Sequence, residues 1–113
     1  MSILRGEIYL TDLGKGKGSE HSGTKYCLIV QNNTGNRYSQ TTTVIPITSE
    51  FKNQKTHVLI ENILEKPSWV RCEQIRTIDK SRLIAKAAYL PKTQMERVER
   101  TLIMQLGIGG VVK

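Results

Sequence analysis

The sequence predicts an α+β domain, in which a compact, strongly bent antiparallel sheet or small β-barrel is followed by one C-terminal helix. Two observations predict this fold class. Short β-rich segments separated by Gly, Asn, Asp and Ser recur up to residue 90, and a single helical pattern follows them. The chain has 113 residues, which fits one domain over residues 1–113.

Six segments have the composition of strands. They span residues 3–13, 25–32, 41–48, 56–61, 69–78 and 84–90. The second contains the run Cys27-Leu28-Ile29-Val30, which is typical of a strand that is buried on both faces. The third is rich in β-branched residues, which favour strands.

The connections between these segments are polar. Residues 14–23 hold four glycines and two lysines, which predicts a mobile, cationic loop. Residues 32–36 are expected to form a turn, residues 49–55 a loop, and residues 79–82 a break after the fifth strand.

The last element is predicted to be a helix that begins at Pro91, because proline fits the first turn of a helix. Gly107 is a natural C-terminal stop. Between them, apolar residues recur at helical spacing and should face the core: Met95, Val98, Leu102 and Leu106.

The net charge is +7 at pH 7 and the pI is near 9.7. Such a charge suits an RNA, a DNA or an acidic protein as partner, although a solvated basic surface explains the composition equally well. The sequence contains no secretory signal pattern and no apolar run long enough to cross a bilayer. We therefore expect a cytoplasmic protein with no membrane association.

The two cysteines, Cys27 and Cys72, lie in strand-like segments. They could pair, but two buried free thiols in a reducing compartment are the favoured interpretation. Neither cysteine has neighbours with metal-ligand spacing, so no zinc site and no other metal or cofactor is predicted.

Five motifs occur in a fixed order along the chain. They are Arg5-Gly6-Glu7-Ile8-Tyr9, Gly18-Ser19-Glu20, Thr48, Thr56-His57-Val58 and Glu73-Gln74-Ile75-Arg76-Thr77-Ile78-Asp79-Lys80. This set resembles the MazF/PemK family of toxin endoribonucleases, and the resemblance extends up to Leu106-Gly107. The long block that begins at Glu73 is its most specific part.

The resemblance implies an SH3-like barrel, a symmetric homodimer, metal-independent cleavage of single-stranded RNA, and an acidic, MazE-like antitoxin that occupies the RNA groove. In this reaction the 2′-hydroxyl attacks the adjacent phosphorus and expels the 5′-oxygen. The products carry a 2′,3′-cyclic phosphate and a 5′-hydroxyl. The protein must therefore stabilise charge on the phosphorane, move protons and splay the strand for in-line attack.

By resemblance, the catalytic positions are Lys25 and Thr48, with Glu20 and His21 beside them on the loop. The family commonly has Arg followed by Pro where this chain has Lys25 and Tyr26. Lysine is a point charge, whereas arginine grips phosphate with a planar fork, so the change should affect rate and mechanism more than fold. The family also commonly has Gln at the position of His21, which is either a proton shuttle or a hydrogen-bonding loop residue.

The residues expected to bind RNA are Lys17, Ser19, Asn32, Glu73 and Gln74. Carboxylates and amides match base edges, although cross-strand pairing is an alternative role for Glu73 and Gln74. His57 and Arg76 are expected to be structural.

The leading interpretation is a sequence-specific endoribonuclease toxin. Two alternatives share the fold: a CcdB-type toxin that binds gyrase without cutting nucleic acid, and an RNA-binding homologue that has lost cleavage. The Ser19-Glu20, Thr48 and Glu73-Gln74 groups favour the RNA interpretation, whereas Lys25 at the family's arginine position weakens it.

Overall fold

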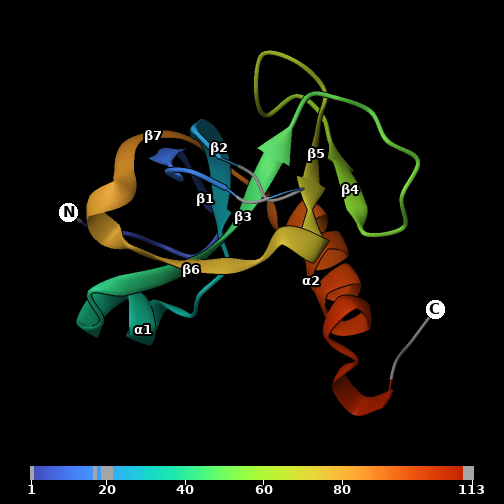
Figure 1. Cartoon of the computed structure of the whole chain (residues 1–113). Helices are drawn as coiled ribbons and strands as arrows, with labels where there is room; N and C mark the ends of the chain where they lie inside the picture. Colours follow the sequence, from blue (N-terminus) through green and yellow to red (C-terminus); the bar gives the residue numbers. More distant parts are fainter. Residues whose placement is uncertain (1, 17, 19–21, 111–113) are drawn as a thin grey trace.

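The computed structural model describes residues 2–16, 18 and 22–110. Across these residues the chain forms a seven-stranded antiparallel sheet and one long C-terminal helix, which confirms the predicted α+β class (Figure 1). The strands are β1 (Glu7–Asp12), β2 (Thr24–Ile29), β3 (Thr41–Thr48), β4 (His57–Ile60), β5 (Ser68–Arg71), β6 (Arg76–Asp79) and β7 (Leu83–Tyr89). Their order is β4-β5-β3-β2-β1-β7, with β6 also paired to β3.

The middle of the sheet is buried on both faces. Along β2, Leu28 belongs to one buried cluster, whereas Cys27 and Ile29 belong to a second. The same alternation occurs on β3, where Ile45 joins the first cluster and Val44 the second. Side chains alternate between faces along a strand, so the uninterrupted apolar run of β2 supplies two cores.

The predicted fifth strand over residues 69–78 is wrong, because it is two strands separated by the 3-10 helix η1 (Cys72–Gln74). Both parts pair with β3, at Ile47↔Val70 and at Val44↔Arg76. Between these pairs β3 advances by three residues while its partner advances by six. The three extra residues form η1.

The predicted turn at residues 32–36 is also wrong, because helix α1 (Asn33–Tyr38) begins there. The Oδ1 atom of Asn32 accepts a hydrogen bond from the backbone N–H of Gly35 at 2.8 Å and so caps the helix. Asn36 is buried, and its side chain accepts a hydrogen bond from Thr42 Oγ1 at 2.7 Å. A polar rather than an apolar residue therefore fixes α1 to the sheet.

The predicted C-terminal helix is confirmed as α2 (Lys92–Leu106), with Pro91 at its N-cap and Gly107 in the left-handed conformation at its C-cap. Met95 and Val98 are buried in the first core cluster, and Leu102 packs against it. Leu106 is 54% exposed, so the apolar stripe leaves the core at the last turn, and the end of α2 extends past the sheet (Figure 1). At the first turns, Arg5 joins α2 to the sheet through a 2.7 Å ion pair with Glu99 and a hydrogen bond to the carbonyl of Val30.

Candidate active site

The structure brings together two of the predicted catalytic residues. Lys25 on β2 and Thr48 on β3 line the same cavity, which has a volume of about 300 Å³. The rest of its lining comes from β1, β2, β3, the two residues after β3, the β4–β5 connection and the first residue of β5: Leu10, Thr24, Tyr26, Ile47, Ser49, Glu50, Leu64, Glu65, Lys66 and Ser68. We refer to this space as the Lys25–Thr48 cavity.

The end of the β2–β3 ladder opens this cavity. The paired positions run from Ile29↔Val44 to Cys27↔Pro46 and stop there. Pro46 has no backbone N–H and cannot donate to a neighbouring strand. The same register extended by two residues places Lys25 opposite Thr48, at the point where the strands are no longer paired and the cavity lies between them.

The two side chains have the exposure and polarity that phosphate binding requires. Lys25 is exposed, and Thr48 is partly exposed. The backbone N–H of Glu50 donates to Thr48 Oγ1 at 3.1 Å. This contact uses an acceptor site of the hydroxyl, so the hydroxyl proton of Thr48 can still be donated to a phosphate oxygen.

No sequence motif predicts that the β4–β5 connection belongs to this site. Glu65 and Lys66 lie in a polar segment with no motif, yet both line the cavity. Their position follows from the hairpin geometry, since β4 and β5 pair directly and the connecting residues project beyond the end of β3. Composition carried no signal for this contact.

Glu73 occupies a polar cluster away from that cavity. Its Oε1 accepts from Thr56 Oγ1 at 2.8 Å, and its Oε2 lies 3.1 Å from His57 Nε2 and 2.9 Å from Arg71 Nη2. Burial raises the pKa of Glu73, but hydrogen bonds from its own backbone amide, Thr56, His57 and Arg71 outweigh burial and hold the pKa below its usual value. The contacts link the motif at Thr56-His57 to the motif that begins at Glu73.

The other predicted RNA-binding residues are dispersed. Asn32 caps α1, and Gln74 is the last residue of η1. The lining of the Lys25–Thr48 cavity includes neither of these two residues, and it does not include Glu73. The remaining predicted site residues lie outside the residues that the structure describes: Lys17, Ser19, Glu20 and His21.

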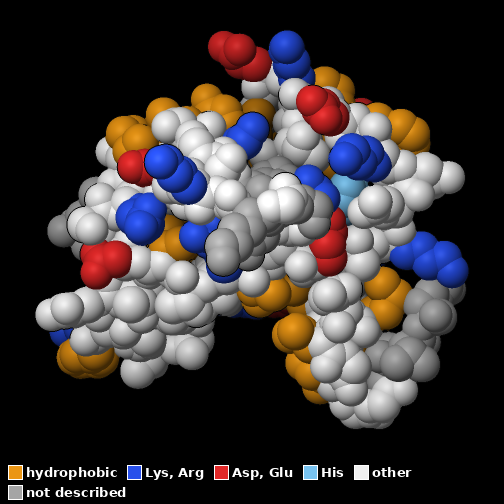
Figure 2. Space-filling view, viewed as in Figure 1, with side chains coloured by type: hydrophobic (Ala, Val, Ile, Leu, Met, Phe, Trp, Pro, Cys, Tyr) orange, Lys and Arg blue, Asp and Glu red, His pale blue; other side chains and the backbone are white. Residues whose placement is uncertain are grey.

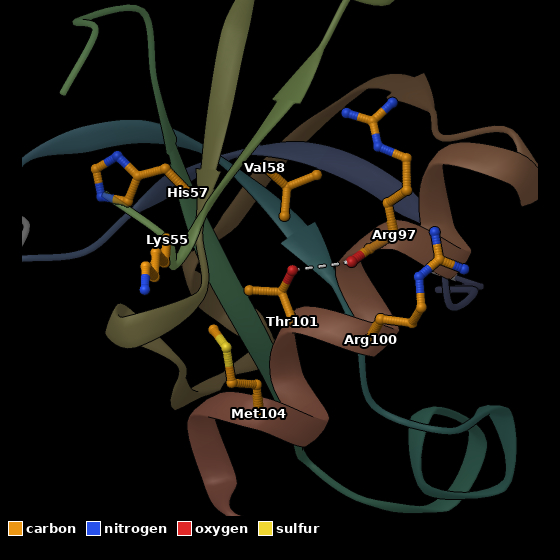
Figure 3. Close-up of a pocket in the computed structure, with 7 residues that line it drawn as sticks. All are labelled: Lys55, His57, Val58, Arg97, Arg100, Thr101 and Met104. Carbon is orange, nitrogen blue, oxygen red and sulfur yellow. Dashed lines mark hydrogen bonds between the residues drawn. The ribbon is translucent and has the colours of Figure 1, made fainter. Parts of the chain in front are cut away.

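A second, more open cleft of about 490 Å³ lies between the start of β4 and α2 (Figure 3). Lys55 and His57 approach it from the β4 side, while Arg97, Arg100, Thr101 and Met104 come from α2. Arg97 Nη2 donates to the carbonyl of Leu59 at 2.5 Å and so ties α2 to β4. The side chain of His57, which is expected to be structural, is 1% exposed, and its Nε2 lies 3.1 Å from Glu73 Oε2.

Cationic side chains are spread across the middle of the face in view in Figure 2. Among the described residues there is no group of three or more His, Cys, Asp or Glu side chains that could hold a metal ion. Within the same residues, none of the helices has the length and hydropathy needed to cross a membrane.

Comparisons with known proteins agree with this architecture. An endoribonuclease in complex with its cognate antitoxin from a mycobacterial species is 26% identical, with a TM-score of 0.81 over 94% of this chain and 96% of that one. MazF from Deinococcus radiodurans has a TM-score of 0.86 and 21% identity, over 96% of this chain and 99% of that one. MazE–MazF from the same organism gives a TM-score of 0.81 over 96% and 99% of the two chains, at 21% identity.

The family model described as PemK-like, MazF-like toxin of type II toxin-antitoxin system matches residues 4–106. This span begins three residues before β1 and ends with the last residue of α2, so it includes every strand of the sheet. The chain therefore belongs to the family of PemK-like, MazF-like toxins of type II toxin-antitoxin systems.

Proposed function

We propose that this toxin is a sequence-specific, metal-independent endoribonuclease that cuts single-stranded RNA, including mRNA. The observation that carries the proposal is the meeting of Lys25 and Thr48 in one cavity at the open end of the β2–β3 ladder. A relative that is 26% identical is described as an endoribonuclease in complex with its cognate antitoxin, which supports the same activity.

In the proposed reaction, Lys25 neutralises charge that develops on the phosphorane, and the Thr48 hydroxyl donates to a non-bridging oxygen. The 2′-hydroxyl of the substrate attacks phosphorus, the bond to the 5′-oxygen breaks, and a 2′,3′-cyclic phosphate and a 5′-hydroxyl result. Glu20 and His21 are the proposed proton-transfer groups, in accordance with the acid-base requirement of this reaction. DNA lacks the 2′-hydroxyl and is not a substrate.

The strand on either side of the cut needs further contacts. We assign these to Lys17 and Ser19 on the glycine-rich loop and to the side-chain amides of Asn32 and Gln74. Glu73 is the fifth proposed contact, although both of its oxygens already accept hydrogen bonds, so a base must share one of them. Gln74 follows Glu73 directly in η1, so the Glu73 cluster fixes the backbone that presents Gln74.

The proposed partners are a second copy of the chain, in a symmetric homodimer, and an acidic antitoxin that blocks the RNA groove. The net charge of +7 supports both a polyanionic substrate and an acidic inhibitor. An RNase of this kind is tolerated by a cell only when its groove can be covered.

The direct test is to incubate the purified protein with a long single-stranded RNA in EDTA and to map the new 5′ ends. We expect cuts at a short recurring motif, with 5′-hydroxyl ends, and no cut where the 2′-hydroxyl is replaced by hydrogen. Activity that EDTA abolishes and magnesium restores would contradict the metal-independent mechanism. RNA that is bound but left intact would favour the homologue without cleavage, to which the lysine at position 25 points. A protein that binds gyrase and ignores RNA would favour the CcdB-type alternative.

A further inference from the structure

An exposed aromatic ring follows Thr48 in the chain. Phe51, three residues after Thr48, is 68% exposed to solvent. Its ring centroid lies 5.5 Å from that of Trp69, and the two rings meet edge to face at 63°. Trp69 is only partly exposed and sits on β5, so it supports Phe51 from the sheet.

The sheet register places this pair next to the predicted catalytic residues. Thr48 pairs directly with Trp69 across β3 and β5. Directly opposed residues in an antiparallel pair project to the same face, and neighbouring strands are about 4.8 Å apart. Extension of the β2–β3 register adds Lys25 on the other side of Thr48. Beyond the last β2–β3 pair, Cys27↔Pro46, this continued register puts Lys25 in line with Thr48 and Trp69 on three neighbouring strands.

The exposed ring has a property that the cavity itself lacks. The cavity lining supplies two lysines, hydroxyls and carboxylates, and its one aromatic residue, Tyr26, carries a polar hydroxyl on its ring. Phe51 has no polar atom on its side chain, and the edge-to-face contact with Trp69 holds its ring while leaving most of it open to solvent. An apolar ring that is held in place and open is suited to a flat, apolar ligand surface.

We propose that Phe51, supported by Trp69, is a stacking platform for the base of a nucleotide next to the phosphate that lies at Lys25 and Thr48. Bases of single-stranded RNA are splayed out and stacked on aromatic side chains by the proteins that bind them. Stacking tolerates every base, so this platform holds the strand in the splayed form that in-line attack needs and leaves the reading of sequence to other residues. The inference rests on the proposed RNA-cleaving function, because it takes the Lys25–Thr48 cavity as the phosphate site.

The test uses a single-stranded 2′-O-methyl oligonucleotide of mixed sequence, which cannot react, and fluorescence of Trp69, the one tryptophan in the sequence. We expect the oligonucleotide to quench this fluorescence. Phe51→Leu, which keeps an apolar side chain but removes the ring, should weaken binding about tenfold, and Phe51→Tyr should restore it. The matched control is Tyr38→Ala, which removes an aromatic side chain that is 75% exposed on α1 and should leave affinity unchanged.

Three results would overturn the platform: wild-type affinity in Phe51→Leu, unchanged Trp69 fluorescence at saturating oligonucleotide, or an equal loss of affinity in Tyr38→Ala. Circular dichroism of each variant shows whether it remains folded. Cleavage of a long RNA is measured separately, so the two proposals fail independently. A protein that stacks the oligonucleotide on Phe51 but does not cut RNA contradicts only the proposed catalysis. A Phe51→Leu variant that cuts RNA at the wild-type rate contradicts only the platform.

Discussion

Lys25 and Thr48 lie on adjacent strands at the point where β2 and β3 separate, and both line the same cavity. Pro46 is the last residue of β3 that pairs with β2, so the cavity begins where the ladder loses its N–H donor. The sequence separates the two side chains, and only the strand register makes them neighbours.

Replacing Lys25 with arginine is the most direct test of whether the lysine limits the cutting rate. If the point charge limits the rate, Lys25→Arg should raise the single-turnover cutting rate while affinity for a non-cleavable RNA stays nearly constant. Lys25→Ala should abolish cutting. A Lys25→Arg rate at or below that of the wild type would mean that lysine is adapted to its own role at this position.

The hydroxyl of Thr48 should matter for chemistry more than for folding. Thr48→Ala removes one donor aimed at the phosphorane and should lower the cutting rate by about a hundredfold, the usual loss for one such donor. Thr43→Ala on the same strand is the matched control, because its hydroxyl contacts Thr77 Oγ1 at 3.4 Å and does not line the cavity. Equal losses in the two variants, or loss of the folded circular dichroism spectrum, would remove Thr48 from the mechanism.

The Glu73 cluster predicts a pH-dependent contribution to stability. The pKa of Glu73 in the folded chain lies below its ordinary value of 4.5, so the stabilisation from its ionised form is complete above about pH 4.5 and is lost as the pH falls through the folded-state pKa. Glu73→Gln should lower the free energy of unfolding by about 1–3 kcal/mol at neutral pH, because Arg71 and His57 lose a charged partner.

Urea unfolding at several pH values measures this effect. The difference between wild type and Glu73→Gln should shrink as the pH is lowered below about 4.5. Glu96→Gln, on the exposed face of α2, should leave stability unchanged within about 0.5 kcal/mol. A wild-type/Glu73→Gln difference that is constant with pH would show that the carboxylate charge does not stabilise the fold.

The elements that could be predicted from sequence are those with a strong local pattern. The β-branched run of β3 was predicted with its observed bounds, and α2 was predicted from its proline, its apolar spacing and its terminal glycine. In contrast, η1 interrupts a segment whose composition is strand-like throughout, because β3 pairs with it in two registers. Such an interruption is set by the partner strand, and no local pattern reports it.

The site was partly predictable for a similar reason. Resemblance to the family identified Lys25 and Thr48, and the structure gives the two residues a common cavity. The resemblance could not identify Glu65 or Lys66, because these residues reach the cavity only where β4 and β5 extend past the end of β3. Nor could it identify Phe51 as a neighbour of Trp69, a contact that depends on the path of the β3–β4 loop.

The two thiols should be inert in the folded protein. Both cysteines are free and buried, as predicted, and burial raises the pKa of Cys27 to about 11 and that of Cys72 to about 12. Thiolate is the reactive form, so labelling by a disulfide reagent at pH 8 should proceed only as fast as the chain opens. Both thiols should react at once in denaturant, and rapid labelling without denaturant would contradict their burial.

Binding to RNA should depend steeply on salt, because cations that include Lys25 and Lys66 line the proposed groove. The logarithm of the affinity for a 2′-O-methyl oligonucleotide should fall linearly with the logarithm of the salt concentration, and Lys66→Ala should reduce the slope by about one phosphate contact. Lys92→Ala, at the start of α2 and outside the cavity lining, should leave the slope unchanged. A slope near zero in the wild type would contradict an electrostatic groove.

The proposed antitoxin gives the last prediction. The physical complement of a basic groove is an acidic, initially disordered segment with a few apolar anchors, which folds along the toxin and places carboxylates where phosphates bind. We expect such a protein to be encoded next to this one, and its C-terminal part alone to inhibit cutting in competition with RNA. Charges at exposed positions such as Lys15 mainly steer encounter, so Lys15→Glu together with Lys17→Glu should slow association more than it speeds dissociation. Stopped-flow association and chase-dissociation rates, measured against Lys92→Glu and Arg100→Glu as a control of equal charge change, separate the two effects. A basic neighbouring protein, or inhibition that does not compete with RNA, would contradict this mode of inhibition, because neither fits carboxylates that occupy the phosphate sites.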